Sequence, residues 1–148
     1  MTGLSNRTAV VTGAGTGIGK GIARCLAEQG ARVVISASSN IDGAENLASD
    51  LRSQGADIRV VQADFRNAAN ATHVVHEAIA AFGHVDILVN NAGRTLNKPF
   101  ANCTEQDWDD VMSVNIKSMF KACQTALPSM LEHGWGRIIN ISSVHSHL

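Results

Sequence analysis

The sequence has no tyrosine, only three cysteines and two prolines among 148 residues, and nearly balanced charge. An odd number of cysteines, at spacings that match no zinc or disulfide framework, predicts reduced and mostly buried thiols. A formal net charge of -1 gives no electrostatic reason to expect nucleic acid or a membrane surface as a partner. No apolar run approaches the length of a membrane span or of a signal-peptide core. These absences favour a cytoplasmic globular protein.

What the sequence does contain is an alternation of strand-like and helix-like segments, with 45% hydrophobic residues overall. Short apolar runs predict strands at residues 8–12, 32–36, 58–63, 85–89 and 137–141. Apolar residues at helical spacing predict helices from Gly17 to Gly30, over 42–54 with Asp42 as N-cap, over 67–82, and in one long stretch to about His133. A capping box of Thr104 and Asp107 would begin the last helix, and Pro128 would kink it.

The predicted strands are apolar on both faces and are joined by helices. That pattern is typical of a parallel sheet covered on both sides. Right-handed crossovers then give an α/β fold, a doubly wound, Rossmann-like sheet in the order 3-2-1-4-5. We expect residues 1–148 to form one such dinucleotide-binding domain, incomplete at its C-terminal side, with the fifth strand at an open edge.

A glycine-rich segment, Thr-Gly-Ala-Gly-Thr-Gly-Ile-Gly, lies between the first predicted strand and its helix. Glycines there let the backbone turn tightly beside a pyrophosphate, while the helix N-terminus offers free N–H groups. The strict G-x-G-x-x-G pattern fails at Ile18, and the Walker A pattern fails at Ala14 and Gly21. The segment predicts dinucleotide binding with a different glycine spacing, and a ligand-free turn is the alternative. The candidate cofactor-binding residues are Thr12, Gly13, Gly15, Thr16, Gly17, Ile18 and Gly19.

This spacing resembles that of the short-chain dehydrogenase/reductase family, and further family motifs follow in the expected order. The third predicted strand is followed by Asp64, and the fourth by Asn90-Asn91-Ala92-Gly93. A predicted helix contains Asn115, and the fifth strand ends with Ile139-Asn140-Ile141-Ser142-Ser143. The resemblance covers nearly the whole chain. It implies hydride transfer between a nicotinamide cofactor and a small alcohol or carbonyl substrate.

The resemblance also implies roles for these residues. Asp64, with Phe65 beside it, would face the adenine amino group, and a helix cap is the alternative role for Asp64. Three small residues would pack against the cofactor, unless they only form a turn: Asn91, Ala92 and Gly93.

Two residues are candidates for catalysis. Asn115 would help hold a water linked to the family's catalytic lysine, and Ser143 would hydrogen-bond the substrate oxygen. The alternative for Asn115 is a buried, hydrogen-bonded asparagine without a catalytic role. The alternative for Ser143 is a serine at a strand end whose hydroxyl hydrogen-bonds backbone groups. The weak pair His145 and His147 does not predict a metal site.

The sequence departs from the family pattern, in which a tyrosine followed by a lysine acts as general acid/base after the serine. No tyrosine is present. We therefore expect the chain as written not to catalyse hydride transfer. Two hypotheses remain: an oxidoreductase of the short-chain type, or a non-catalytic nucleotide-binding module or pseudoenzyme.

Cofactor choice and assembly can also be predicted. No carboxylate lies between Glu28 and Asp42, where NAD-specific proteins bind the ribose, and Ser36 and Ser38 offer hydroxyls. NADP is therefore favoured, with NAD as the alternative. The last long helix carries more apolar residues than one buried face needs, so the resemblance implies a homodimer or homotetramer, against the alternative of an intramolecular core helix.

Overall fold

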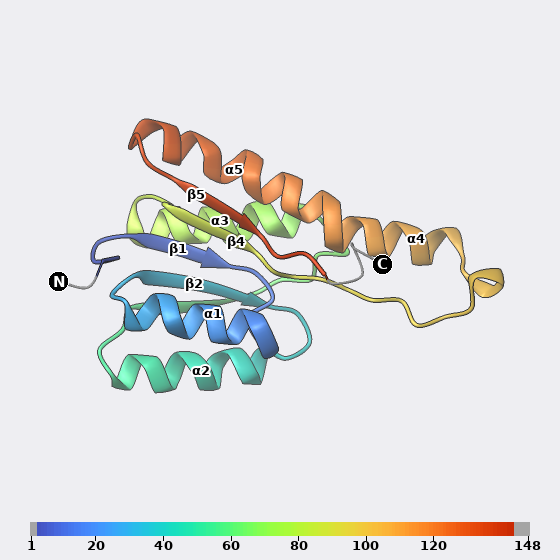
Figure 1. Cartoon of the computed structure of the whole chain (residues 1–148), viewed down its shortest axis with the longest axis horizontal. Coiled ribbons are helices and arrows are strands. Elements are labelled where there is room, and N and C mark those ends of the chain that lie inside the picture. Colours follow the sequence, from blue (N-terminus) through green and yellow to red (C-terminus); the bar gives the residue numbers. More distant parts are fainter. Residues whose placement is uncertain (1–2, 144–148) are drawn as a thin grey trace.

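The structure is a computed structural model that describes residues 3–143. Its strands form one parallel sheet in the order β3-β2-β1-β4-β5, which confirms the predicted topology (Figure 1). The strands are β1 (Thr8–Val11), β2 (Arg32–Ala37), β3 (Ile58–Gln62), β4 (Ile87–Asn90) and β5 (Arg137–Asn140). Because all five run in the same direction, their carboxyl ends lie along one edge of the sheet.

Helices cover both faces of the sheet. One face carries α1 (Gly17–Glu28) and α2 (Ile41–Ser53), and the other carries α3 (Ala69–Phe82) and α5 (Ser118–Glu132) (Figure 1). Before α5 lie the 3-10 helix η1 (Phe100–Asn102), α4 (Glu105–Met112) and the π-helix η2 (Ser113–Lys117).

Three details of the helices differ from the expectations or refine them. The predicted single long helix is divided by η2, and Pro128 lies inside α5 without ending it. The N-cap of α2 is Asn40 and not Asp42, because the Asn40 side chain accepts the Gly43 N–H. The capping box of Thr104 and Asp107 is confirmed at the start of α4.

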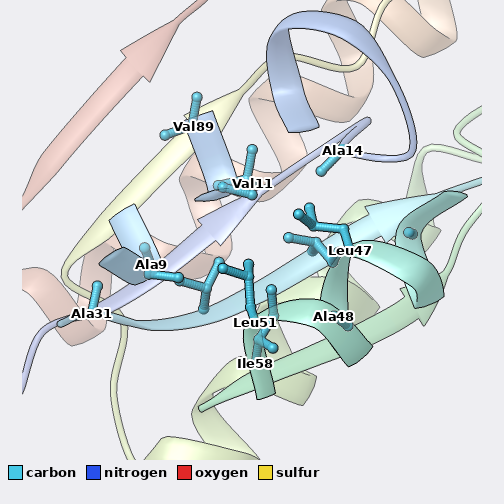
Figure 2. Close-up of a cluster of buried hydrophobic side chains, with 14 of the residues drawn as sticks. Ala9, Val11, Ala14, Ala31, Leu47, Ala48, Leu51, Ile58 and Val89 are labelled. Atoms are coloured by element: carbon cyan, nitrogen blue, oxygen red, sulfur yellow. The ribbon is translucent and has the colours of Figure 1, made fainter. Parts of the chain in front are cut away.

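Two apolar clusters, one on each face of the sheet, form the core. On one face, Val11 packs with Leu47 and Leu51 of α2 (Figure 2). Ile35 belongs to the same cluster. The adjacent strand residues point the other way: on the opposite face, Val10, Val34 and Leu88 pack against Val74 and Val75 of α3. Side chains alternate between the faces of a strand, so burial of both faces explains the continuous apolar runs in the sequence.

The cysteine expectation was wrong in part. All three thiols are free, but Cys25 is exposed and the other two are only half-buried. Cys25 lies on α1, whose buried positions are Gly19, Ala23 and Ala27. Within residues 3–143, no helix combines the length and the apolar character that crossing a membrane would require.

Candidate functional site

A cleft of about 770 Å³ lies along the carboxyl edge of the sheet. Ligand pockets typically measure about 300–1,000 Å³, and this edge is where doubly wound sheets bind ligands. Of the predicted cofactor-binding residues, those that line the cleft are Gly13, Gly15, Thr16, Gly17, Ile18, Ser36, Ser38, Asp64, Phe65, Asn91, Ala92 and Gly93. The other two, Thr12 and Gly19, are buried and are not among the lining residues.

Close packing against other parts of the chain explains two of the glycines. Gly13 has φ +67, and a Cβ there would lie 2.8 Å from the Ala92 Cα. A Cβ on Gly19 would lie 2.5 Å from the Gly13 carbonyl oxygen. These glycines therefore hold the loop in shape. Gly17, with φ +53 and nothing within 4 Å of its Cβ position, is the one that faces open space.

The N-terminus of α1 opens on this loop without a cap. Its N-cap residue, Thr16, makes no side-chain capping hydrogen bond, and no acidic residue lies in the first turn. An uncapped helix N-terminus presents N–H groups and the positive end of the helix dipole. The loop and helix end therefore fit a pyrophosphate in both shape and charge.

Thr12 and Asn91 join the glycine loop to the segment after β4. The Thr12 hydroxyl accepts the N–H groups of Asn91 and Ala92, both at 3.0 Å. In return, the Asn91 side-chain amide donates to the carbonyls of Thr12 and Gly13, each at 3.0 Å. Since Thr12 is only 3% exposed, its role is to position the wall of the cleft.

Asn40 is a site residue that the sequence reasoning missed. Its Nδ2 donates to the Gly15 carbonyl at 3.0 Å, and its Oδ1 accepts the Gly43 N–H at 3.2 Å. One side chain thus caps α2 and fixes the glycine loop. The signal in the sequence was an asparagine directly before a helical pattern, which predicts an N-cap. Nothing local indicated the contact with Gly15, 25 positions away.

Asp64 lies at the cleft wall but is paired with Arg66, which the sequence reasoning also missed. Its Oδ1 accepts the Arg66 N–H at 2.9 Å, and its Oδ2 accepts the guanidinium Nε at 2.8 Å and Nη2 at 2.5 Å. These hydrogen bonds, first from the guanidinium and then from the backbone, lower the pKa of Asp64 below its usual value. Its side chain does not cap α3, whose N-cap is Ala68. Phe65 beside it is 5% exposed.

The end of β2 forms another part of the wall. Ser36 is 1% exposed, whereas Ser38 and Ser39 are exposed. Gln62 at the end of β3 donates to the Ser38 carbonyl at 3.4 Å. Residues 36–40, at the end of β2 and in the loop after it, line the cleft and read Ser-Ala-Ser-Ser-Asn. This part of the wall therefore contains no acidic residue.

Asn115 lies in η2, a π-helical segment of a kind often found at functional sites. Its Oδ1 accepts the Arg94 N–H at 2.7 Å and its Nδ2 donates to the Arg94 carbonyl at 2.9 Å. The side chain thus holds the segment after β4 in place, as a half-buried, hydrogen-bonded asparagine. Ser143 follows β5 at the same edge of the sheet, is exposed, and is not among the residues that line the cleft.

No group of three or more metal-ligating side chains occurs in the part of the chain that the structure describes. His145 and His147 lie outside the described residues.

The parallel sheet, the carboxyl-edge cleft and the uncapped, glycine-rich start of α1 define an α/β protein with a Rossmann-like fold. The chain belongs to the short chain dehydrogenase family, whose sequence model matches residues 7–148.

Individual relatives agree with this assignment. The chain is 39% identical to a 3-oxoacyl-(acyl-carrier-protein) reductase FabG of Staphylococcus aureus, over 93% of this chain and 56% of the relative. A putative short-chain alcohol dehydrogenase from Sinorhizobium meliloti superposes with a TM-score of 0.90 and 35% identity, over 99% of this chain and 58% of the other. A metagenomic short-chain oxidoreductase in complex with NADP gives a TM-score of 0.88 and 34% identity, over 95% and 64%. The chain therefore spans little more than half the length of the curated relatives that it matches.

Proposed function

We propose that this protein is an NADP-dependent oxidoreductase that transfers hydride between the nicotinamide and a small alcohol or carbonyl substrate. The observation that carries the proposal is the uncapped start of α1 within a cleft whose β2 side bears no carboxylate. The 2′-phosphate of NADP would be repelled by an acidic residue there, whereas the ribose 2′-OH of NAD is usually bound by one. One solved relative is described as a complex with NADP, which supports the same choice.

In this proposal the nicotinamide supplies or accepts the hydride, and the chain's residues bind and orient. The start of α1 would hold the pyrophosphate, and the Asp64 carboxylate would accept a hydrogen bond from the adenine amino group. Ser143, exposed after β5, would hydrogen-bond the substrate oxygen. Asn115 would act through Arg94, because its side-chain amide is bonded to the backbone of that residue.

Proton transfer at the substrate oxygen is not assigned to any of the 148 residues, because the family's acid/base is a tyrosine and none is present. A positioned acid/base is typically worth about 10²–10⁴-fold in rate. The cleft and the uncapped start of α1 would equally serve a second candidate, a non-catalytic nucleotide-binding module. NADP binding without turnover on a panel of alcohols and carbonyls would favour the module; turnover would favour the enzyme.

A matched pair of variants tests the binding proposal. Gly17 has positive φ and open space around it, and asparagine and aspartate both tolerate that backbone region. Gly17→Asp and Gly17→Asn therefore differ only in a negative charge at the helix start. We expect Gly17→Asp to bind NADP at least about tenfold more weakly than Gly17→Asn, measured by calorimetry. Equal affinities in the two variants would contradict the proposed phosphate site.

Assembly into a homodimer or homotetramer is proposed with this function. Large apolar side chains are exposed along α4, η2 and α5: Trp108 (67%), Ile116 (52%), Phe120 (58%), Leu127 (45%) and Leu131 (70%). Exposed apolar surface of this extent is typical of protein–protein contacts. Light scattering should give a dimer or tetramer at micromolar concentration; a monomer would contradict the proposal. The predicted cytoplasmic location is consistent with the three free thiols.

A further inference from the structure

The end of β2 offers hydroxyls to a 2′-phosphate but no cation, since Ser38, Ser39 and Asn40 carry none. A dianionic phosphate is bound most strongly by charge-assisted hydrogen bonds, above all from arginine. The structure brings two arginines to the same cleft, Arg66 and Arg94. They differ in how firmly they are held.

Arg94 is committed to other contacts. Its guanidinium pairs with Asp110 of α4 at 2.8 Å, and the Asp110 side chain is only 17% exposed. The Arg94 backbone is bonded at both its N–H and its carbonyl to Asn115. Arg66, in contrast, pairs with Asp64 where both side chains are exposed, 59% and 43%. Exposed ion pairs contribute little net stability, so this pair can exchange partners at low cost.

The sheet places Arg66 beside the end of β2. β2 and β3 are paired neighbours, with Ala37 opposite Gln62, and the Ala63 N–H bonds the Ala37 carbonyl at 2.9 Å. Adjacent strands lie about 4.8 Å apart. The chain therefore leaves β3 alongside Ser38, and Arg66 follows within a few residues, with its guanidinium folded back over Asp64.

We propose that Arg66 is the cofactor-specificity residue of this cleft: its guanidinium leaves Asp64 and binds the 2′-phosphate of NADP, with the hydroxyls of Ser38 and Ser39 as further donors. The inference rests on the proposed function. Asp64 keeps its position during the exchange, because Oδ1 still accepts the Arg66 N–H at 2.9 Å. Oδ2, which holds the guanidinium here, becomes available to accept the adenine amino group. Binding of the phosphate and binding of the adenine are thereby coupled through one side chain.

Binding measurements with paired ligands test this inference. Calorimetry of NADP and NAD, and of 2′,5′-ADP and 5′-AMP, would be run on the wild-type protein, on Arg66→Gln and on Arg59→Gln. Arg59 is an exposed residue of β3 that lies over the Phe82 ring and does not line the cleft, so its variant is the matched loss of one positive charge. We expect Arg66→Gln to weaken NADP and 2′,5′-ADP by roughly 10- to 100-fold. NAD and 5′-AMP should bind no more weakly than they do to the wild-type protein, because loss of the guanidinium leaves Asp64 Oδ2 free for the adenine. Arg59→Gln should change none of the four.

The outcomes separate this inference from the function on which it rests. A wild-type protein that binds neither NADP nor NAD overturns the proposed function. A wild-type protein that binds NADP, with Arg66→Gln binding it equally well, overturns the role of Arg66 and leaves the function intact. Equal weakening of all four ligands by Arg66→Gln also overturns the inference, since it would mean that Arg66 holds the adenine or the fold and not the 2′-phosphate.

Discussion

The Asn115 side chain hydrogen-bonds both backbone groups of Arg94: Oδ1 accepts the Arg94 N–H at 2.7 Å, and Nδ2 donates to the Arg94 carbonyl at 2.9 Å. Two segments 21 residues apart, η2 and the chain after β4, are thereby fixed to each other. The Arg94 segment forms one wall of the cleft, so the geometry of that wall depends on an amide in another part of the chain.

Replacement of Asn115 by alanine should therefore loosen the cleft as well as the fold. Two half-buried backbone groups lose their partners, at about 1–3 kcal/mol for an unsatisfied group. We expect a lower free energy of unfolding in urea together with weaker NADP binding. Asn102→Ala, at an exposed position of η1, is the control. A destabilised Asn115→Ala protein with unchanged NADP affinity would show that the contact supports only the fold.

Thr12→Val should destabilise the protein, because the Thr12 hydroxyl accepts two N–H groups, from Asn91 and Ala92, in a site that is 3% exposed. Valine has nearly the same shape but no acceptor, which leaves both donors unpaired at a cost of about 1–3 kcal/mol. Thr12→Ser keeps the acceptor and is the matched control. Urea unfolding of both variants makes the comparison, and equal loss in the two would assign the effect to the methyl group.

Asp86→Asn should be among the more damaging changes on the edge of the sheet opposite the cleft. The Asp86 side chain is 1% exposed and accepts from Arg7 Nη1 at 2.9 Å and the Thr8 N–H at 2.8 Å, with His84 Nε2 at 2.9 Å. Removing the charge of this buried carboxylate, whose partners Arg7 and His84 are only partly buried, should cost about 1–3 kcal/mol. The control is Asp57→Asn, at an exposed position, which should leave the free energy of unfolding nearly unchanged. A loss below about 1 kcal/mol in Asp86→Asn would contradict this view of the network.

The start of α4 should lose stability in acid because of Asp107. Hydrogen bonds from Lys98, and from the backbone and hydroxyl of Thr104, lower the pKa of Asp107 to about 2. Because the pKa of Asp107 in the folded protein lies below the unfolded value of about 3.9, its ionised carboxylate stabilises the fold fully at pH values above about 3.9. This stabilisation is lost as the pH falls through the folded pKa. The Asp107 carboxyl signal in NMR should titrate with a midpoint near 2.

A variant separates this residue from general acid denaturation. Asp107→Asn should show a smaller fall in stability across the same acidic range than the wild-type protein does. Asp109→Asn, at an exposed position of the same helix, should follow the wild-type dependence. A midpoint near the ordinary value for an aspartate would refute the contribution of Lys98.

Features that depend on near neighbours and on hydrophobic patterning could be predicted from the amino-acid sequence. The apolar runs predicted the strands and their burial on both faces, and the alternation with helices predicted the sheet order. The capping box of Thr104 and Asp107 was readable because the two residues lie three apart. The glycine loop was readable because its spacing and its place between a strand and a helix carry a physical requirement.

The hydrogen bonds that hold the cleft and the charges that line it could not be predicted from the sequence, because they join residues far apart in the chain. Asn40 reaches Gly15, Asn115 reaches Arg94, and Thr12 meets Asn91 only because parallel strands bring their ends to one edge. The charge of the cleft also depends on the packing of the sheet: residues 36–40 after β2 carry no cation, while Arg66 comes from the end of the neighbouring β3. A hydrogen bond or an ion pair between residues far apart in sequence leaves no local pattern, because its partner is chosen by the packing of the sheet and not by the residues beside it.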